Sequence, residues 1–91
     1  THSLIARINV VPSKYIILQT PEGERAVIFP SDSFYHDDVA KHFDDCEVVS
    51  AGFVCIKPDG VLECHGRSTG LNMESRGKDD EVVIRHQLRR V

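Results

Sequence analysis

The chain has 91 residues, of which 41% are hydrophobic and 27% charged, a balance that predicts one small folded domain over residues 1–91 and excludes disorder. Lys and Arg number 11 against 14 Asp and Glu, and this net charge of −3 argues against a broad basic surface for nucleic acid. Because no apolar run could span a bilayer and the 3 cysteines do not predict a disulfide framework, we expect a cytoplasmic protein without membrane partners.

The first third of the chain is rich in β-branched residues. Apolar alternation predicts strands over residues 4–11, 14–20 and 25–29. The segment Pro21–Glu24 lies between the last two, and its Gly23 supplies the conformational freedom that a tight hairpin needs. We therefore expect a three-stranded meander.

A short helix is predicted over residues 34–43. His36 and Val39 fall on one stripe of that helix, as expected for a face directed at the core. Asp37 and Asp38 lie in its first turn, where negative charge suits the positive end of the helix dipole.

A second hairpin is predicted from residue 47 onward. Strands over residues 47–56 and 61–65 flank Lys57–Gly60 (Lys-Pro-Asp-Gly), which is the strongest turn signal in the chain. Gly52 inside the first of these strands indicates a bulge, or a close approach of another backbone or a ligand.

The end of the chain predicts a loop and a helix. Residues 66–77 are rich in Gly and Ser, and residues 78–90 form an amphipathic pattern with an acidic start and a basic end. The predicted fold class is therefore α+β: a mixed, mostly antiparallel sheet of about five strands flanked by two helices, in the order β-β-β-α-β-β-α.

His36 is the candidate catalytic residue. The positive end of a helix disfavours imidazolium, so the ring would be neutral near pH 7 and keep one nitrogen as an acceptor. A general base needs such an acceptor. The alternative is a boundary histidine that packs against Phe34 or Tyr35.

The glycine-rich segment 66–70 is the candidate anion site. Its two glycines allow backbone amides to turn inward, and the hydroxyls of Ser68 and Thr69 can donate to an oxyanion. Lys14 and Arg67 could each bring a positive charge to an anion held there. The alternative is an irregular connection with two solvated cations.

The cysteines do not predict a metal site. Cys46, Cys55 and Cys64 are evenly spaced, without the local C-x-x-C or H-x-x-x-H pair that structural zinc usually shows. Free thiols on paired strands usually act as small hydrophobic side chains, and nothing basic nearby would activate them. We therefore expect no metal and no cofactor.

Three segments carry a resemblance to a known family. They are Lys14–Leu18 (Lys-Tyr-Ile-Ile-Leu), Tyr35–Val39 (Tyr-His-Asp-Asp-Val) and Val61–Gly70 (Val-Leu-Glu-Cys-His-Gly-Arg-Ser-Thr-Gly). In this order they are similar to the Lys-Tyr-Val-Leu-Ile strand, the Tyr-His-Ala-Asp-Ile helix start and the Val-Tyr-Gly-Tyr-Ser-Met-Ala-Tyr-Gly strand and loop of the Janus/Ocnus family. The correspondence covers about residues 13–88.

The resemblance implies a Janus-like sheet flanked by two helices and metal-free hydrolysis of a phosphoramidate. His36 would match the catalytic base of the family and Lys14 its phosphate-contacting lysine. Ser68, with the Thr69 and Gly70 amides, would match its phosphate cradle. The implied substrate is a phosphorylated protein or a small phosphoramidate.

Departures from the family pattern leave other functions open. Asp37 stands where the family has a small residue, and a carboxylate beside a phosphate site repels the substrate. One alternative is a non-catalytic cytoplasmic adaptor or protein-interaction domain, also as a homodimer, whose 66–70 loop binds a peptide or anion. Another is a small RNase that uses His36 and His65 as acid and base.

Overall fold

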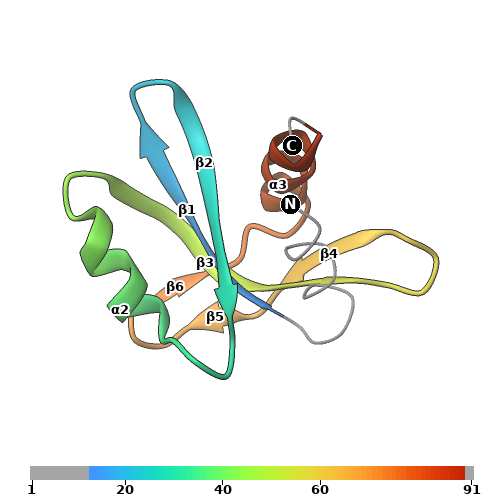
Figure 1. Cartoon of the computed structure of the whole chain (residues 1–91), viewed down its shortest axis with the longest axis horizontal. Coiled ribbons are helices and arrows are strands. Elements are labelled where there is room, and N and C mark those ends of the chain that lie inside the picture. The colour runs from blue at the N-terminus through green and yellow to red at the C-terminus, as the bar shows by residue number, and fades with distance from the viewer. Residues whose placement is uncertain (1–12, 90–91) are drawn as a thin grey trace.

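The computed structural model describes residues 13–89 (Figure 1). Their elements in chain order are β1 (Ser13–Thr20), β2 (Gly23–Pro30), α2 (His36–Ala40), the 3₁₀ helix η1 (Lys41–Phe43), β3 (Glu47–Ile56), β4 (Leu62–His65), β5 (Arg67–Ser68), β6 (Met73–Glu74) and α3 (Lys78–Leu88). The main sheet has the strand order β2-β1-β3-β4, and β5 and β6 form a separate two-stranded sheet.

The predicted α+β class is confirmed. All strand pairings within residues 13–89 are antiparallel, and the strand predicted over residues 4–11 lies outside the described residues. The first helix is shorter than the predicted 34–43, because α2 begins at His36 and the chain then tightens into η1. None of the helices between residues 13 and 89 has the length and apolar composition needed to cross a membrane.

The segment 66–77, predicted as a loop, contains the small β5–β6 hairpin. Ser68 pairs with Met73, and the Asn72 amide donates to the Thr69 carbonyl at 3.2 Å to close the turn. Two residues per strand are too few to show the alternation that identifies a strand in sequence. The hairpin is nevertheless what gives the glycine-rich segment a defined position.

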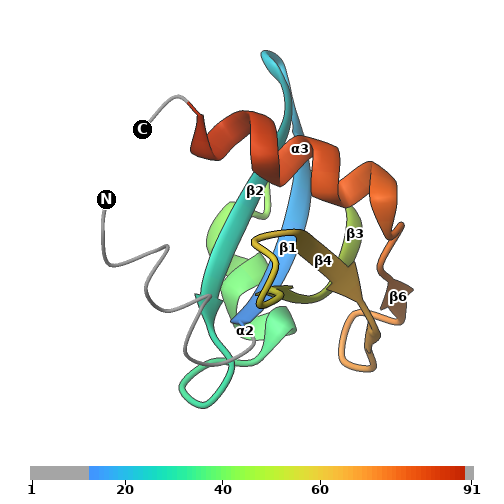
Figure 2. The same cartoon turned by 90° about the vertical axis from the view of Figure 1, so that its right-hand side faces the viewer.

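The core lies on both faces of the main sheet, with β1 in its centre. Tyr15 and Ile17 pack with Ile84 of α3 on one face, whereas Ile16 packs with Val39 of α2 on the other. Figure 2 shows α3 crossing in front of the strands and α2 behind them. Successive side chains of a strand point to opposite faces, so β1, which is buried on both, reads as a continuous apolar run.

A buried carboxylate fastens α3 to the sheet. Asp80 is fully buried and accepts hydrogen bonds from the Tyr15 hydroxyl at 2.5 Å, the Ser50 hydroxyl at 2.8 Å and the Arg76 Nε at 2.7 Å. Arg76 also donates to both oxygens of Glu24 on β2, at 2.7 and 3.1 Å. Burial, and then the hydrogen bond to Asp80, raises the pKa of Tyr15 well above its usual range, so its hydroxyl stays a donor.

The outer edge of β2 is occupied by a side chain of α3. The Ala26 amide donates to Gln87 Oε1 and Gln87 Nε2 donates to the Ala26 carbonyl, both at 2.8 Å. The Gln87 amide thus copies the two hydrogen bonds that a neighbouring strand would make at this position.

Candidate functional site

One hollow of about 310 Å³, called here the His36 hollow, is lined by the candidate base and by the candidate phosphate-binding residues Lys14, Arg67, Ser68, Thr69 and Gly70. It lies between the start of β1, the start of α2, the middle of β3 and the β5–β6 hairpin. The lining residues are Lys14, Tyr35, His36, Asp37, Phe53, Arg67, Ser68, Thr69 and Gly70. His65 is not among them, so the structure does not join it to His36 in one hollow, as an RNase pair of acid and base would need.

The His36 ring is fixed by contacts on three sides. Its centroid lies 5.6 Å from that of Phe29 and 5.7 Å from that of Phe53, both edge-on, and the residue is only 6% exposed. Its Nε2 lies 2.8 Å from the Gly52 carbonyl oxygen. A carbonyl can only accept, so Nε2 carries the proton and Nδ1 is the acceptor of the neutral ring. Nδ1 has no hydrogen-bond partner within residues 13–89.

Burial lowers the pKa of His36 below its ordinary value of 6.5. The positive charge of Lys14 acts in the same direction, whereas the hydrogen bond to Gly52 and the charge of Asp37 act against it. The ring is therefore neutral at pH 7. From the sequence, we expected the dipole of the helix to keep the His36 ring neutral. Helix α2 has only 5 residues, however, and the main cause in the structure is burial.

The two cations hold different positions at the rim. Lys14 Nζ donates to the Phe34 carbonyl at 2.9 Å and lies 5.0 Å from the centroid of the Tyr35 ring. Arg67 is exposed, and its guanidinium donates to the Asn72 side chain at 3.3 Å. Both side chains thus bring positive charge to the hollow, and Lys14 is tethered directly beside α2.

The glycine-rich turn presents backbone more than hydroxyl groups. Ser68 is 2% exposed, and its Oγ accepts a hydrogen bond from the Leu71 amide at 3.2 Å, so this hydroxyl helps to hold the turn. Thr69 and Gly70 are exposed. A Cβ at Gly70 would lie 3.1 Å from both Cγ and Oδ1 of Asp37, which places that carboxyl against the turn. An ionised Asp37 therefore competes with any anion for the Gly70 side of the hollow.

Gly52 is the partner of His36 that the sequence did not identify. The close approach predicted at this glycine is confirmed, since a Cβ there would lie 2.6 Å from the His65 carbonyl oxygen and 3.0 Å from Ser75 Cβ. The absence of a side chain lets the end of β4 and the residue after β6 lie against β3, beside the carbonyl that orients His36. The contact between His36 and the Gly52 carbonyl depends on how α2 lies against β3, which the sequence pattern does not determine.

The three thiols are not activated. Burial raises the pKa of Cys64 to about 12 and raises those of Cys46 and Cys55 as well, so none is a thiolate at pH 7. Within residues 13–89, the one cluster of His, Cys, Asp or Glu side chains spaced to hold a metal ion lies outside the His36 hollow, on β3 and β4.

In comparisons with protein-family models, with curated proteins and with solved structures, this chain matches none. The resemblance to the Janus/Ocnus family therefore stays an expectation from three short motifs.

Proposed function

We propose that this chain hydrolyses phosphoramidates, in the manner of a protein-histidine phosphatase, with the phosphoryl group held in the His36 hollow. The observation that carries the proposal is a buried neutral histidine, with Nδ1 as its acceptor, in the same hollow as two cations and an exposed glycine turn. The substrate would be a phosphohistidine side chain or a small phosphoramidate. With three free thiols, a reducing cytoplasm suits the protein.

The proposed step begins with a water molecule hydrogen-bonded to Nδ1 of His36. Its oxygen forms a bond to phosphorus while Nδ1 accepts the proton, and the bond from phosphorus to the leaving nitrogen breaks with its electron pair. The leaving nitrogen then takes a proton from solvent. Lys14, Arg67 and the Thr69 and Gly70 amides would offset the negative charge on the phosphoryl oxygens.

A second candidate is an adaptor that binds a phosphorylated peptide without turnover. Phe34 and Tyr35 are 50% and 70% exposed, and Tyr35 lines the hollow. Exposed aromatic side chains beside an anion site are typical of peptide recognition. This function needs the cations but no free base, so the two candidates differ in what His36 must do.

The deciding experiment measures release of inorganic phosphate from a phosphohistidine peptide and from phosphoramidate. We expect turnover by the native chain, loss of at least roughly 100-fold of kcat in His36→Gln, and a raised KM in Lys14→Gln. His42→Gln is the matched control, because His42 lies on η1 away from the hollow and should leave the rate unchanged. Circular dichroism and a thermal melt of each variant establish that it is folded.

Turnover that persists in a folded His36→Gln variant contradicts the hydrolase proposal. If the native chain binds the phosphopeptide without turnover, and Lys14→Gln weakens that binding while His36→Gln does not, the adaptor replaces the hydrolase.

A further inference from the structure

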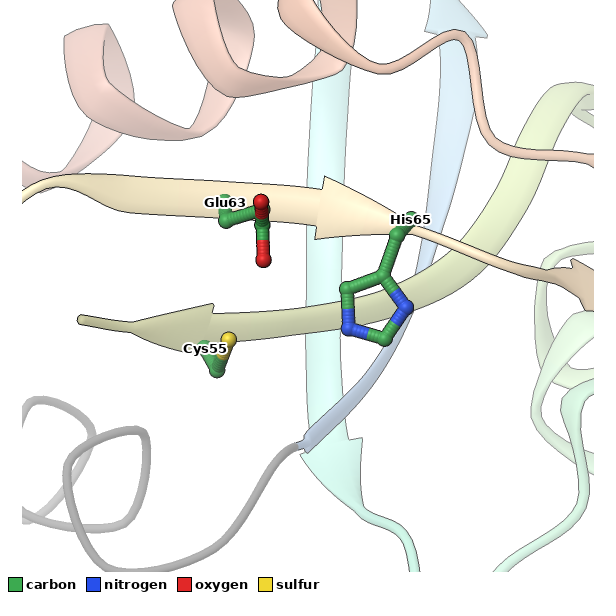
Figure 3. Close-up of side chains that lie close together, drawn as sticks. All are labelled: Cys55, Glu63 and His65. Carbon is green, nitrogen blue, oxygen red and sulfur yellow. The ribbon is translucent and has the colours of Figure 1, made fainter.

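Three side chains with metal-binding atoms gather on the hairpin of β3 and β4 (Figure 3). Cys55 and Glu63 are direct partners in the register of this hairpin, and His65 lies two residues beyond Glu63 on the same strand. Residues two apart on a strand share a face, so all three side chains point to the same side. One ligand atom of each lies within 4.8 Å of those of the other two.

The cluster lies on the face of the hairpin that α3 does not cover. The intervening residues Val54, Leu62 and Cys64 are buried in the core with Ile84 of α3, so their neighbours along each strand point away from that helix. Cys55 and Glu63 are half-buried and His65 is exposed. An ion can therefore reach the three side chains from solvent.

We propose that Cys55, Glu63 and His65 bind a divalent ion of the zinc class. Thiolate sulfur, imidazole nitrogen and carboxylate oxygen are the three ligand types that zinc takes from proteins. The Cys55 thiol is protonated in the free chain, so the ion displaces its proton to solvent on binding. Bond lengths of about 2.0–2.3 Å in tetrahedral geometry put ligand atoms roughly 3.5 Å apart. The three ligand atoms, which lie within 4.8 Å of one another, would reach that spacing by rotation of side chains on adjacent strands. The fourth position is left to water or to a ligand from solution.

The neighbouring contacts are compatible with such an ion. Glu63 Oε2 pairs with Lys57 Nζ at 3.1 Å, which leaves Oε1 to coordinate. The His65 ring stacks on Phe53, with centroids 6.1 Å apart and 19° between the planes, and this contact limits the orientations that the imidazole can take. The charge of Lys57 opposes a second cation, so Lys57 weakens the site without blocking it.

This site is separate from the His36 hollow. None of the three ligands lines the hollow, although Phe53 touches both the His65 and His36 rings. Metal binding and phosphoramidate hydrolysis can therefore be tested independently of each other.

The probe is Co²⁺, which replaces zinc and reports a bound thiolate through a charge-transfer band in the near ultraviolet. We expect the native chain to bind one equivalent with this band, and Zn²⁺ to displace it. Cys55→Ser should abolish the band, and Glu63→Gln and His65→Gln should each weaken binding by roughly tenfold or more. Cys46→Ser and His42→Gln, a half-buried thiol and an exposed histidine outside the cluster, should bind as the native chain does.

Lys57→Gln gives a test that a merely structural effect would not pass. It removes the opposing charge and should tighten Co²⁺ binding several-fold, whereas Lys41→Gln should not. His36→Gln should keep the band whether or not the hydrolase proposal holds. The inference is overturned if the native chain binds no Co²⁺, or if the band survives in folded Cys55→Ser or is lost equally in the Cys46→Ser control.

Discussion

Replacing Asp80 with Asn tests whether the buried carboxylate holds the fold together. Oδ1 of Asp80 accepts from Ser50 and from the Arg76 side chain, and Oδ2 accepts from Tyr15 and from the Arg76 amide. An asparagine has the same shape but only one acceptor oxygen. Whichever position its NH₂ group takes, that group faces two donors and can accept from neither.

The expected loss in the free energy of unfolding follows from these four hydrogen bonds. One buried hydroxyl and one part-buried N–H of Arg76 lose their acceptor, at about 1–3 kcal/mol each, and Arg76 loses one of its two carboxylate partners. The two lost acceptors together cost about 2–6 kcal/mol, and we take about 3 kcal/mol as the expected loss in the free energy of unfolding. A chain of 91 residues has a free energy of unfolding of roughly 5–14 kcal/mol, so the variant would be left with marginal stability.

The assay is urea unfolding followed by circular dichroism, together with a thermal melt. A loss of about 3 kcal/mol lowers the Tm by roughly 12–24 °C for a domain of this size. Asp79→Asn is the matched control, because Asp79 lies in the same first turn of α3 but is exposed. If Asp80→Asn is no less stable than Asp79→Asn, the network does not fasten α3 to the sheet and the reasoning fails.

Two further predictions concern the His36 hollow. Because the pKa of folded His36 lies below its ordinary 6.5, the unfolded chain binds the extra proton first, so this residue's contribution to stability falls as the pH drops below 6.5. Urea unfolding between pH 7 and 5 should show a smaller loss in His36→Gln than in the native chain, and equal losses would contradict the burial argument. Asp37→Asn should tighten inorganic phosphate binding, measured by calorimetry, by about 1 kcal/mol or roughly fivefold. Exposed Asp38→Asn should leave that affinity unchanged, and an equal gain in both variants would show a general charge effect instead.

The sequence predicts the parts of this fold that local patterns determine. β1 and β2 follow from apolar runs around a turn with Gly23, and β3 and β4 from the Lys-Pro-Asp-Gly turn at residues 57–60. The β5–β6 hairpin is not predicted from the sequence, because strands of two residues are too short to show an alternating pattern. Helix α2 ends early because its last turn tightens into η1, which a stripe of apolar residues does not reveal.

The sequence predicts most of the residues that line the His36 hollow, but not the contacts between them. His36, Lys14 and the glycine-rich segment are named by residue type and motif order, and His36, Lys14 and residues 67–70 do line one hollow. The Gly52 carbonyl and the Asp37 carboxyl against Gly70 depend on how segments far apart in sequence align. The Cys55, Glu63 and His65 cluster could have been predicted from the sequence, because a turn at residues 57–60 fixes the register that sets Cys55 opposite Glu63.

The Gln87 side chain has a consequence for association between molecules. An open strand edge is a template on which another chain can add a strand. At Ala26 that template is already filled by the Gln87 amide, so an incoming strand would have to displace both of its hydrogen bonds. The Gln87 amide thus protects the middle of β2 against the addition of a strand from a second copy of the chain at this position.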